Sequence, residues 1–258
     1  MPRADKYIAA LFPSGASKTA VRSRVLTQVE AAALSNGLQS DAADFYYSGW
    51  VTFLDALHGV EKGFYTWATV KLYYSVFYAL RAALAHDDVC AFHVGASSYT
   101  VVAQAGSLPL SCTDRGTHGT VLRTFQRRNP GHALVSQQID LEDAVDWLMH
   151  KREAANYARG RFSEPECSSE LAQVARNGLR KTLNAYVADT SFSYVFDPDH
   201  AMVAYPLRAL QLVGTVLAAR GPATLDDDEK QFLKLRTRDA SGGLAVLMSE
   251  MKRLKLLT

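Results

Sequence analysis

The stretch GFYTWATVKLYYSVFYALRAALAH, residues 63–86, decides the fold. Between Phe64 and Leu84 it carries only two charged residues, Lys71 and Arg81, so apolar groups would surround a helix on every side. A helix that is apolar all round has to be buried among other elements. We therefore predict a central core helix over Gly63–His86, in which the aromatic side chains serve mainly as packing groups.

Helical spacing of apolar residues continues on both sides of this stretch and predicts further helices. Asn36 and Gly37 are typical of a helix C-cap, while Asp41, Asp140 and Asp226 are typical of N-caps. The flanking helices are predicted over residues 18–34, 41–58, 118–127, 141–159, 168–189, 202–219, 226–237 and 242–257.

Two segments depart from the helical pattern. Residues 1–18 are predicted to form a loose arm, and Val89–Ser111 has short alternating runs with glycines that favour a small β-hairpin inserted between helices. The predicted fold class is therefore all-α: an antiparallel helical bundle with a small hairpin insertion and a C-terminal helical extension.

The composition restricts the classes of function. The formal net charge is +2, and no block of like charges marks a polyanion-binding tail, so any nucleic-acid contact would be a local basic patch. Cys90, Cys112 and Cys167 have no disulfide-framework spacing, which fits a reducing compartment. The longest apolar helical run, residues 209–219, is about half as long as a membrane span. We expect a cytoplasmic protein with no signal peptide and no membrane-spanning segment.

Three segments together resemble a known family. YYSVFYALRAALA at Tyr73–Ala85 resembles the central helix of the HEPN superfamily, a group of helical domains found in prokaryotic defence and toxin-linked proteins. THGTVLRTF at Thr117–Phe125 is similar to the family's histidine-containing segment, and LMHKREAANYARG at Leu148–Gly160 is similar to its later helix. The order and spacing agree over roughly residues 41–162, which is under half of the chain.

This resemblance implies a domain order and partners. It implies a HEPN-like bundle over residues 41–162. The sequence outside this match predicts an N-terminal arm and helix over residues 1–40 and a C-terminal helical lobe over 163–258. The resemblance also implies that the bundle dimerises or docks a partner protein, and that RNA is a candidate ligand. It implies no metal and no cofactor.

Many members of the family are metal-independent RNases that use an arginine placed shortly before a histidine. The histidine acts as acid or base on the ribose 2′-hydroxyl, and the arginine stabilises the phosphate charge. This chain contains two such pairs, Arg81 with His86 and Arg127 with His132. The spacing is also expected by chance, and neither pair lies where the family has its catalytic pair. The best-matching segment has Tyr157 in place of a histidine, and a phenol is a poor base at neutral pH.

The sequence predicts one further ligand site, for nucleic acid, and offers a zinc site as an alternative. Arginines suit phosphate because their guanidinium groups are forked, so a nucleic-acid-binding face is predicted at Arg123, Arg127, Arg128 and Arg152. A zinc site is a weaker alternative that would use two pairs of residues flanking the hairpin, namely Cys90 with His93 and Cys112 with His118.

The sequence leaves three hypotheses for the function of the protein. The first is a HEPN-like RNA- or protein-binding component of a bacterial defence or toxin-linked system. The second is an active endoribonuclease that uses one of the Arg/His pairs. The third is a structural helical subunit of a larger complex.

Overall fold

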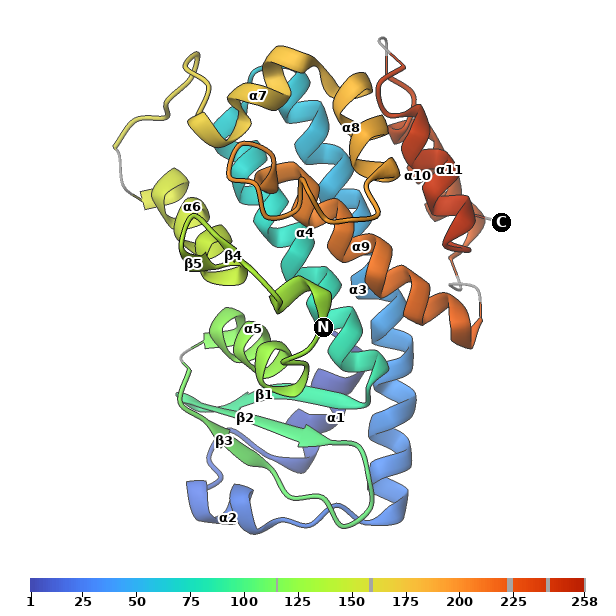
Figure 1. Cartoon of the computed structure of the whole chain (residues 1–258). Coiled ribbons are helices and arrows are strands. Elements are labelled where there is room, and N and C mark those ends of the chain that lie inside the picture. The colour runs from blue at the N-terminus through green and yellow to red at the C-terminus, as the bar shows by residue number, and fades with distance from the viewer. Residues whose placement is uncertain (115, 158–159, 222–224, 240–241, 258) are drawn as a thin grey trace. The chain divides into compact units, whose positions relative to one another are not determined.

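The computed structural model describes residues 1–114, 116–157, 160–221, 225–239 and 242–257. The chain is mostly helical, at 64% helix, with a few small antiparallel sheets, so the all-α prediction holds approximately. Figure 1 labels the elements, whose bounds among these residues are α1 Arg3–Leu11, α2 Lys18–Ser23, α3 Gln28–Glu61, α4 Tyr65–His86, β1 Val89–Val94, β2 Ser97–Val102, β3 Leu110–Cys112, α5 Gly116–Arg128, the short 3-10 helix Ala133–Val135, β4 Gln138–Ile139, β5 Glu142–Asp143, α6 Ala144–Tyr157, α7 Ser169–Asn177, α8 Leu179–Ala188, α9 Ala201–Arg220, α10 Asp227–Arg236 and α11 Ala245–Arg253.

The central helix is confirmed. Helix α4 runs from Tyr65 to His86, and every residue from Ala68 to His86 is buried or half-buried. Burying a large apolar side chain contributes roughly 1.5–3 kcal/mol. A helix covered over most of its surface therefore acts as a core against which neighbouring elements pack.

The predicted break at Asn36 and Gly37 is wrong, because α3 runs unbroken over 34 residues from Gln28 to Glu61. Gly37 has a packing role instead. A Cβ atom at this position would lie 3.2 Å from the backbone nitrogen of Ala4. The missing side chain lets the first residues of α1 approach α3 closely.

The predicted loose arm is also wrong, since residues 3–11 form α1. The first turn of α1 is held by Asp41. The sequence predicted Asp41 as the N-cap of its own helix, but it lies in the interior of α3. The Asp41 carboxylate accepts hydrogen bonds of 2.8 Å from the backbone N–H groups of Arg3 and Ala4. Asp41 is thus an N-cap, but of α1 and not of its own helix.

The chain divides into two compact units, each built from two separate segments. Unit 1 comprises Met1–Phe45 and Leu80–Pro130, and unit 2 comprises Tyr46–Ala79 and Gly131–Thr258. The predicted boundary at residue 40 falls inside α3. Local turn signals cannot reveal such a division, because it depends on contacts between segments that are distant in sequence.

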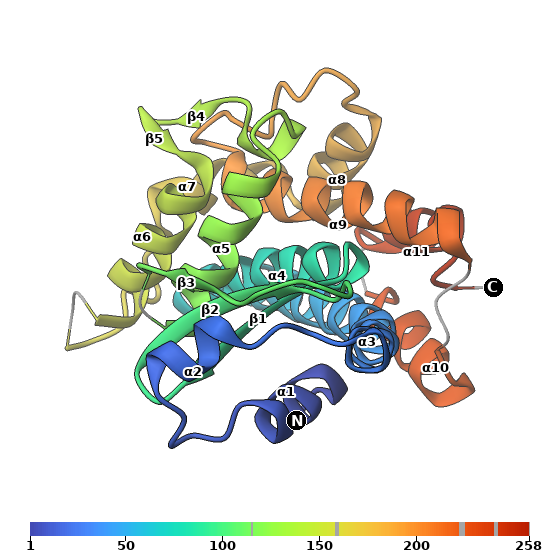
Figure 2. The same ribbon diagram turned by 90° about the horizontal axis from the view of Figure 1, so that it is seen from below.

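Unit 1 contains the expected hairpin, extended by a third strand. Strands β1 and β2 pair antiparallel from Val89 with Val102 to Val94 with Ser97, and β3 joins the other edge of β2. Helix α5 covers one face of this sheet, and α1 lies on the other (Figure 2). The Phe92 ring stacks on Phe12 at 5.1 Å, which fixes the end of α1 to the sheet.

In unit 2, two helix boundaries differ from those predicted from the sequence. Asp140 is not an N-cap: Asp140 and Leu141 both have positive φ and form the turn between β4 and β5 before α6 begins at Ala144. Gly178, with φ of 77°, divides the single helix predicted over residues 168–189 into α7 and α8. The predicted cap at Asp226 is confirmed, because its side chain and that of Glu229 form a reciprocal capping box on α10.

Helix α9 meets α3 at a very close approach. The Tyr46 hydroxyl of α3 donates a 3.1 Å hydrogen bond to the backbone oxygen of Leu210, and a Cβ atom at Gly214 would lie 1.9 Å from that hydroxyl. By length and composition α9 is apolar enough to span a membrane, but 67% of its most apolar window is buried inside the protein. Core helices of proteins without a membrane span pass the same test.

We predict that Gly214→Ala destabilises the protein. Alanine favours a helix by about 1 kcal/mol over glycine, but the new methyl group would displace the Tyr46 ring and break its hydrogen bond, at a cost of about 1–3 kcal/mol. Urea unfolding followed by circular dichroism measures the difference. Gly131→Ala is the control, because a Cβ atom there has no neighbour within 4 Å. Equal or higher stability of Gly214→Ala would contradict the close approach.

Candidate functional site

The first predicted catalytic pair, Arg81 and His86, is not assembled. The Arg81 guanidinium lies 4.0 Å from the Phe45 ring centre and 3.5 Å from Asp5. His86 is 8% exposed, and its Nδ1 is 3.0 Å from the Asp87 carboxylate. Its Nε2 is buried and has no hydrogen-bond partner among the described residues. Five residues along a helix also turn the two side chains about 140° apart.

The second pair, Arg127 and His132, has structural contacts in separate units. Arg127 lies in the last turn of α5, 3.3 Å from the Asp114 carboxylate. His132 begins the 3-10 helix, where its Nδ1 accepts a 3.2 Å hydrogen bond from the backbone N–H of Leu134. Both contacts stabilise ends of local structure.

The four arginines predicted to bind nucleic acid do not share one role. Arg123, Arg127 and Arg128 lie on α5, where Arg123 bonds to Gln126 and the other two are exposed in the last turn. Arg152 of α6 is only 12% exposed and lies 4.9 Å from the Tyr73 ring centre. Its guanidinium therefore packs on the central helix. The rest of the matched segment, Ala158 and Arg159, lies outside the described residues.

The zinc alternative fails on strand geometry. Cys90 and His93 are three apart on β1, so their side chains point to opposite faces of the sheet. Within the part of the chain that the structure describes, no three histidine, cysteine or acidic side chains gather as a metal site.

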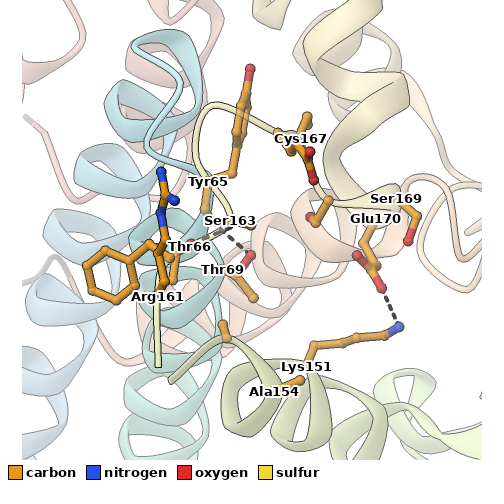
Figure 3. A pocket seen from close by; sticks show the side chains of 14 residues that line it. Tyr65, Thr66, Thr69, Lys151, Ala154, Arg161, Ser163, Cys167, Ser169 and Glu170 are labelled. Atoms are coloured by element: carbon orange, nitrogen blue, oxygen red, sulfur yellow. Dashed lines mark hydrogen bonds and ion pairs between the residues drawn. The ribbon is translucent and has the colours of Figure 1, made fainter. Parts of the chain in front are cut away.

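Unit 2 contains a polar hollow of about 390 Å³ beside the start of α4 (Figure 3). Six of its 14 lining residues carry a hydroxyl group, and Lys151 forms an ion pair with Glu170 across it. Burial raises the pKa of the Cys167 thiol, and this effect outweighs the hydrogen bond with Tyr65, which lowers the pKa. The thiol is therefore protonated at neutral pH and is a poor nucleophile.

Glu164 anchors the segment that closes this hollow. Its carboxylate accepts 2.7 Å hydrogen bonds from the backbone N–H and the hydroxyl of Thr66, in the first turn of α4. Burial raises the pKa of Glu164, but these hydrogen bonds outweigh that effect and leave the pKa below its ordinary value. The start of α4 is thus already occupied by a carboxylate, which makes this hollow a poor site for a further anion.

A second hollow has a different chemistry. This aromatic groove, of about 520 Å³, lies between α3, α4 and α10 of unit 2. It is lined by Val51, Thr52, Asp55, Lys71, Tyr74, Tyr78, Phe232 and Arg236. Three of these side chains are aromatic and two are cationic.

The rings and cations of the aromatic groove are arranged close together. The Tyr74 and Tyr78 ring centres are 6.3 Å apart, and the Arg236 guanidinium lies 4.9 Å from the Phe232 ring centre. Lys71 lies 2.7 Å from the Asp55 carboxylate in a pair that solvent reaches. Such an exposed pair contributes at most about 1 kcal/mol, so Lys71 can exchange Asp55 for another anion.

The backbone of α10 is tied to α3 at the aromatic groove. His58 Nε2 lies 2.8 Å from the backbone oxygen of Arg236, within hydrogen-bond distance. This contact fixes the last turn of α10 and with it the position of the Arg236 side chain.

Sequence reasoning missed the aromatic groove because it assigned all the tyrosines of α4 to packing. A usable signal was present in Lys71. A charged residue in an otherwise apolar helix marks the face nearest to solvent, and Tyr74 and Tyr78 follow it at spacings of three and seven. No such signal pointed to Phe232 or Arg236, which reach the groove only through the tertiary fold.

Comparisons with family models, with curated proteins and with solved structures find no match to this chain.

We predict that Glu164→Gln destabilises the protein by about 1 kcal/mol at neutral pH, the usual value of a helix cap. The folded-state pKa of Glu164 lies below 4.5. The carboxylate's contribution is therefore complete above that value and is lost as the pH falls through the folded-state pKa. The free energies of unfolding of wild type and variant should therefore converge in acid. Urea unfolding at neutral pH and at a pH below the folded-state pKa measures the two differences. Glu166→Gln, on the same segment, is the control, and a gap that persists in acid would contradict the assignment.

Proposed function

We propose that this chain is an RNA-binding component of HEPN type and that RNA binds in the aromatic groove of unit 2. The HEPN assignment, and with it the role in a bacterial defence or toxin-linked system, rests on the resemblance of Tyr73–Ala85, Thr117–Phe125 and Leu148–Gly160. In this proposal the protein works in the cytoplasm, as a homo-oligomer or with a partner protein. The free thiols of Cys90, Cys112 and Cys167 fit that compartment.

The observation that carries the RNA proposal is the combination of rings and cations in one hollow. Nucleobases stack on aromatic side chains and on guanidinium planes, and each base stacked in this way contributes about 1–3 kcal/mol. Tyr74, Tyr78 and Phe232 supply the rings, and Lys71 and Arg236 supply charge for phosphate.

Binding is favoured over cleavage by the positions of the histidines. An endoribonuclease needs a ring nitrogen that can reach a ribose hydroxyl. The Nε2 of His86 is buried, and at His132 the Nδ1 accepts a backbone hydrogen bond, which leaves that ring only its Nε2 for such a role. The endoribonuclease therefore stands as the alternative, and the structural subunit is the outcome if no RNA binds.

We predict that single-stranded RNA binds at low salt and that Tyr74→Leu or Arg236→Gln weakens binding by about tenfold, as the loss of one stacked base requires. Two cations at phosphates give a slope of roughly −1.4 in log affinity against log salt concentration. Fluorescence anisotropy of labelled RNA in EDTA measures both quantities.

Matched controls are Tyr157→Leu and Arg220→Gln, which change a tyrosine and an arginine that do not line the groove. Intact RNA after the measurement is expected, and cleavage in EDTA would support the endoribonuclease instead. Absence of binding at low salt would exclude the proposal.

We predict that Asp55→Asn tightens RNA binding several-fold. The change removes the carboxylate that pairs with Lys71 and repels phosphate in the aromatic groove. The gain should disappear at high salt, because salt screens exposed charges. Asp44→Asn, on the same helix but outside the groove, should leave the affinity unchanged. Equal affinity of Asp55→Asn and wild type at low salt would argue against phosphate at Lys71.

A further inference from the structure

The aromatic groove occupies one end of a longer surface on α4. At 100° per residue, Trp67, Lys71, Tyr74 and Tyr78 fall within an arc of about 60° on one side of the helix. The groove includes the last three of these residues but not Trp67. From Tyr78 to Trp67 the helix rises about 16 Å, which is more than one nucleotide can span.

An exposed aromatic pair lies at the Trp67 end of this surface. Trp67 and Phe162 are 47% and 53% exposed, with ring centres 5.9 Å apart in an edge-to-face arrangement. Contiguous exposed apolar side chains are one mark of a binding surface. Their open faces offer a base the same kind of contact that the groove offers.

The cation of this surface lies between its two aromatic parts. Lys71 is one helical turn from both Trp67 and Tyr74, and the pair with Asp55 leaves it accessible to solvent. Bases at Tyr74 and at Trp67 would therefore be joined by a backbone whose phosphate passes Lys71. Charge and ring positions fit a strand that lies along the helix.

On the basis of the proposed function, we infer that the ligand is a single-stranded RNA segment that runs along α4 from the aromatic groove to Trp67 and Phe162. One base stacks at Tyr74 and Tyr78, and a later base stacks at Trp67. A duplex does not fit this arrangement, because its bases are stacked on one another and cannot reach the rings. The path is on the order of four nucleotides, near the lower limit of single-strand binding sites.

Trp67 itself provides the test, because it is the one exposed tryptophan of the three. Trp50 and Trp147 are 0% and 2% exposed. Tryptophan emission of the full-length protein is measured during titration with oligouridylates from the dinucleotide to the octanucleotide, and with an RNA duplex. We expect the octanucleotide to quench the emission and the dinucleotide, bound in the groove, to quench it much less.

Two variants distinguish the contribution of the Trp67 ring to binding from its use as the fluorescent reporter. Trp67→Phe should abolish the quenching and keep the affinity, because it retains an aromatic ring. Trp67→Leu should weaken octanucleotide binding by about tenfold and leave dinucleotide binding unchanged. Both changes are at an exposed side chain, so circular dichroism should show the wild-type fold.

Failure of the RNA path along α4 and failure of the proposed function would give different results. Octanucleotide binding that depends on Tyr74 but leaves Trp67 emission unchanged would overturn the path and leave the groove intact. Equal quenching by the duplex would overturn the single-stranded ligand. Failure of every RNA to bind would overturn the proposed function itself, and with it this inference.

Discussion

The burial of α4 dictates how the neighbouring helices pack. Its residues from Ala68 to His86 are all buried or half-buried, so each neighbouring element has to supply a surface for it. Close contacts make this shielding possible. At Gly49 of α3, a Cβ atom would lie 3.4 Å from the backbone oxygen of Ser75 in α4. The same helix carries the candidate site, because its least covered face supplies Lys71, Tyr74 and Tyr78 to the aromatic groove.

Two helices of this protein begin at carboxylates that come from distant parts of the chain. Asp41, from the interior of α3, binds the first turn of α1, and Glu164 binds the first turn of α4. A local cap can form within an isolated helix, but these caps form only when the tertiary structure is in place. The helix ends are therefore coupled to the packing of the whole unit, and a change at either carboxylate acts at a distance along the sequence.

The sequence was sufficient for elements whose signals are local. The apolar circumference of α4 and the capping box at Asp226 both depend on neighbouring residues, and both were predicted correctly. Gly37 and Asp41 carry local signals that misled, because each is used in a contact between α1 and α3. The aromatic groove could be only half anticipated. Lys71 marks the open face of α4, whereas Arg236 joins it through α10, and no pattern in the sequence links the two.

The interleaving of the two units limits how this chain can be divided. Each unit is made of two segments, and the middle segments alternate between units along the chain. No single cut in the gene therefore separates one complete unit from the other. A contiguous fragment that ends at residue 130 would contain all of unit 1 together with orphaned apolar surfaces of α3 and α4. Either unit alone would therefore have to be assembled from two separate pieces of the chain.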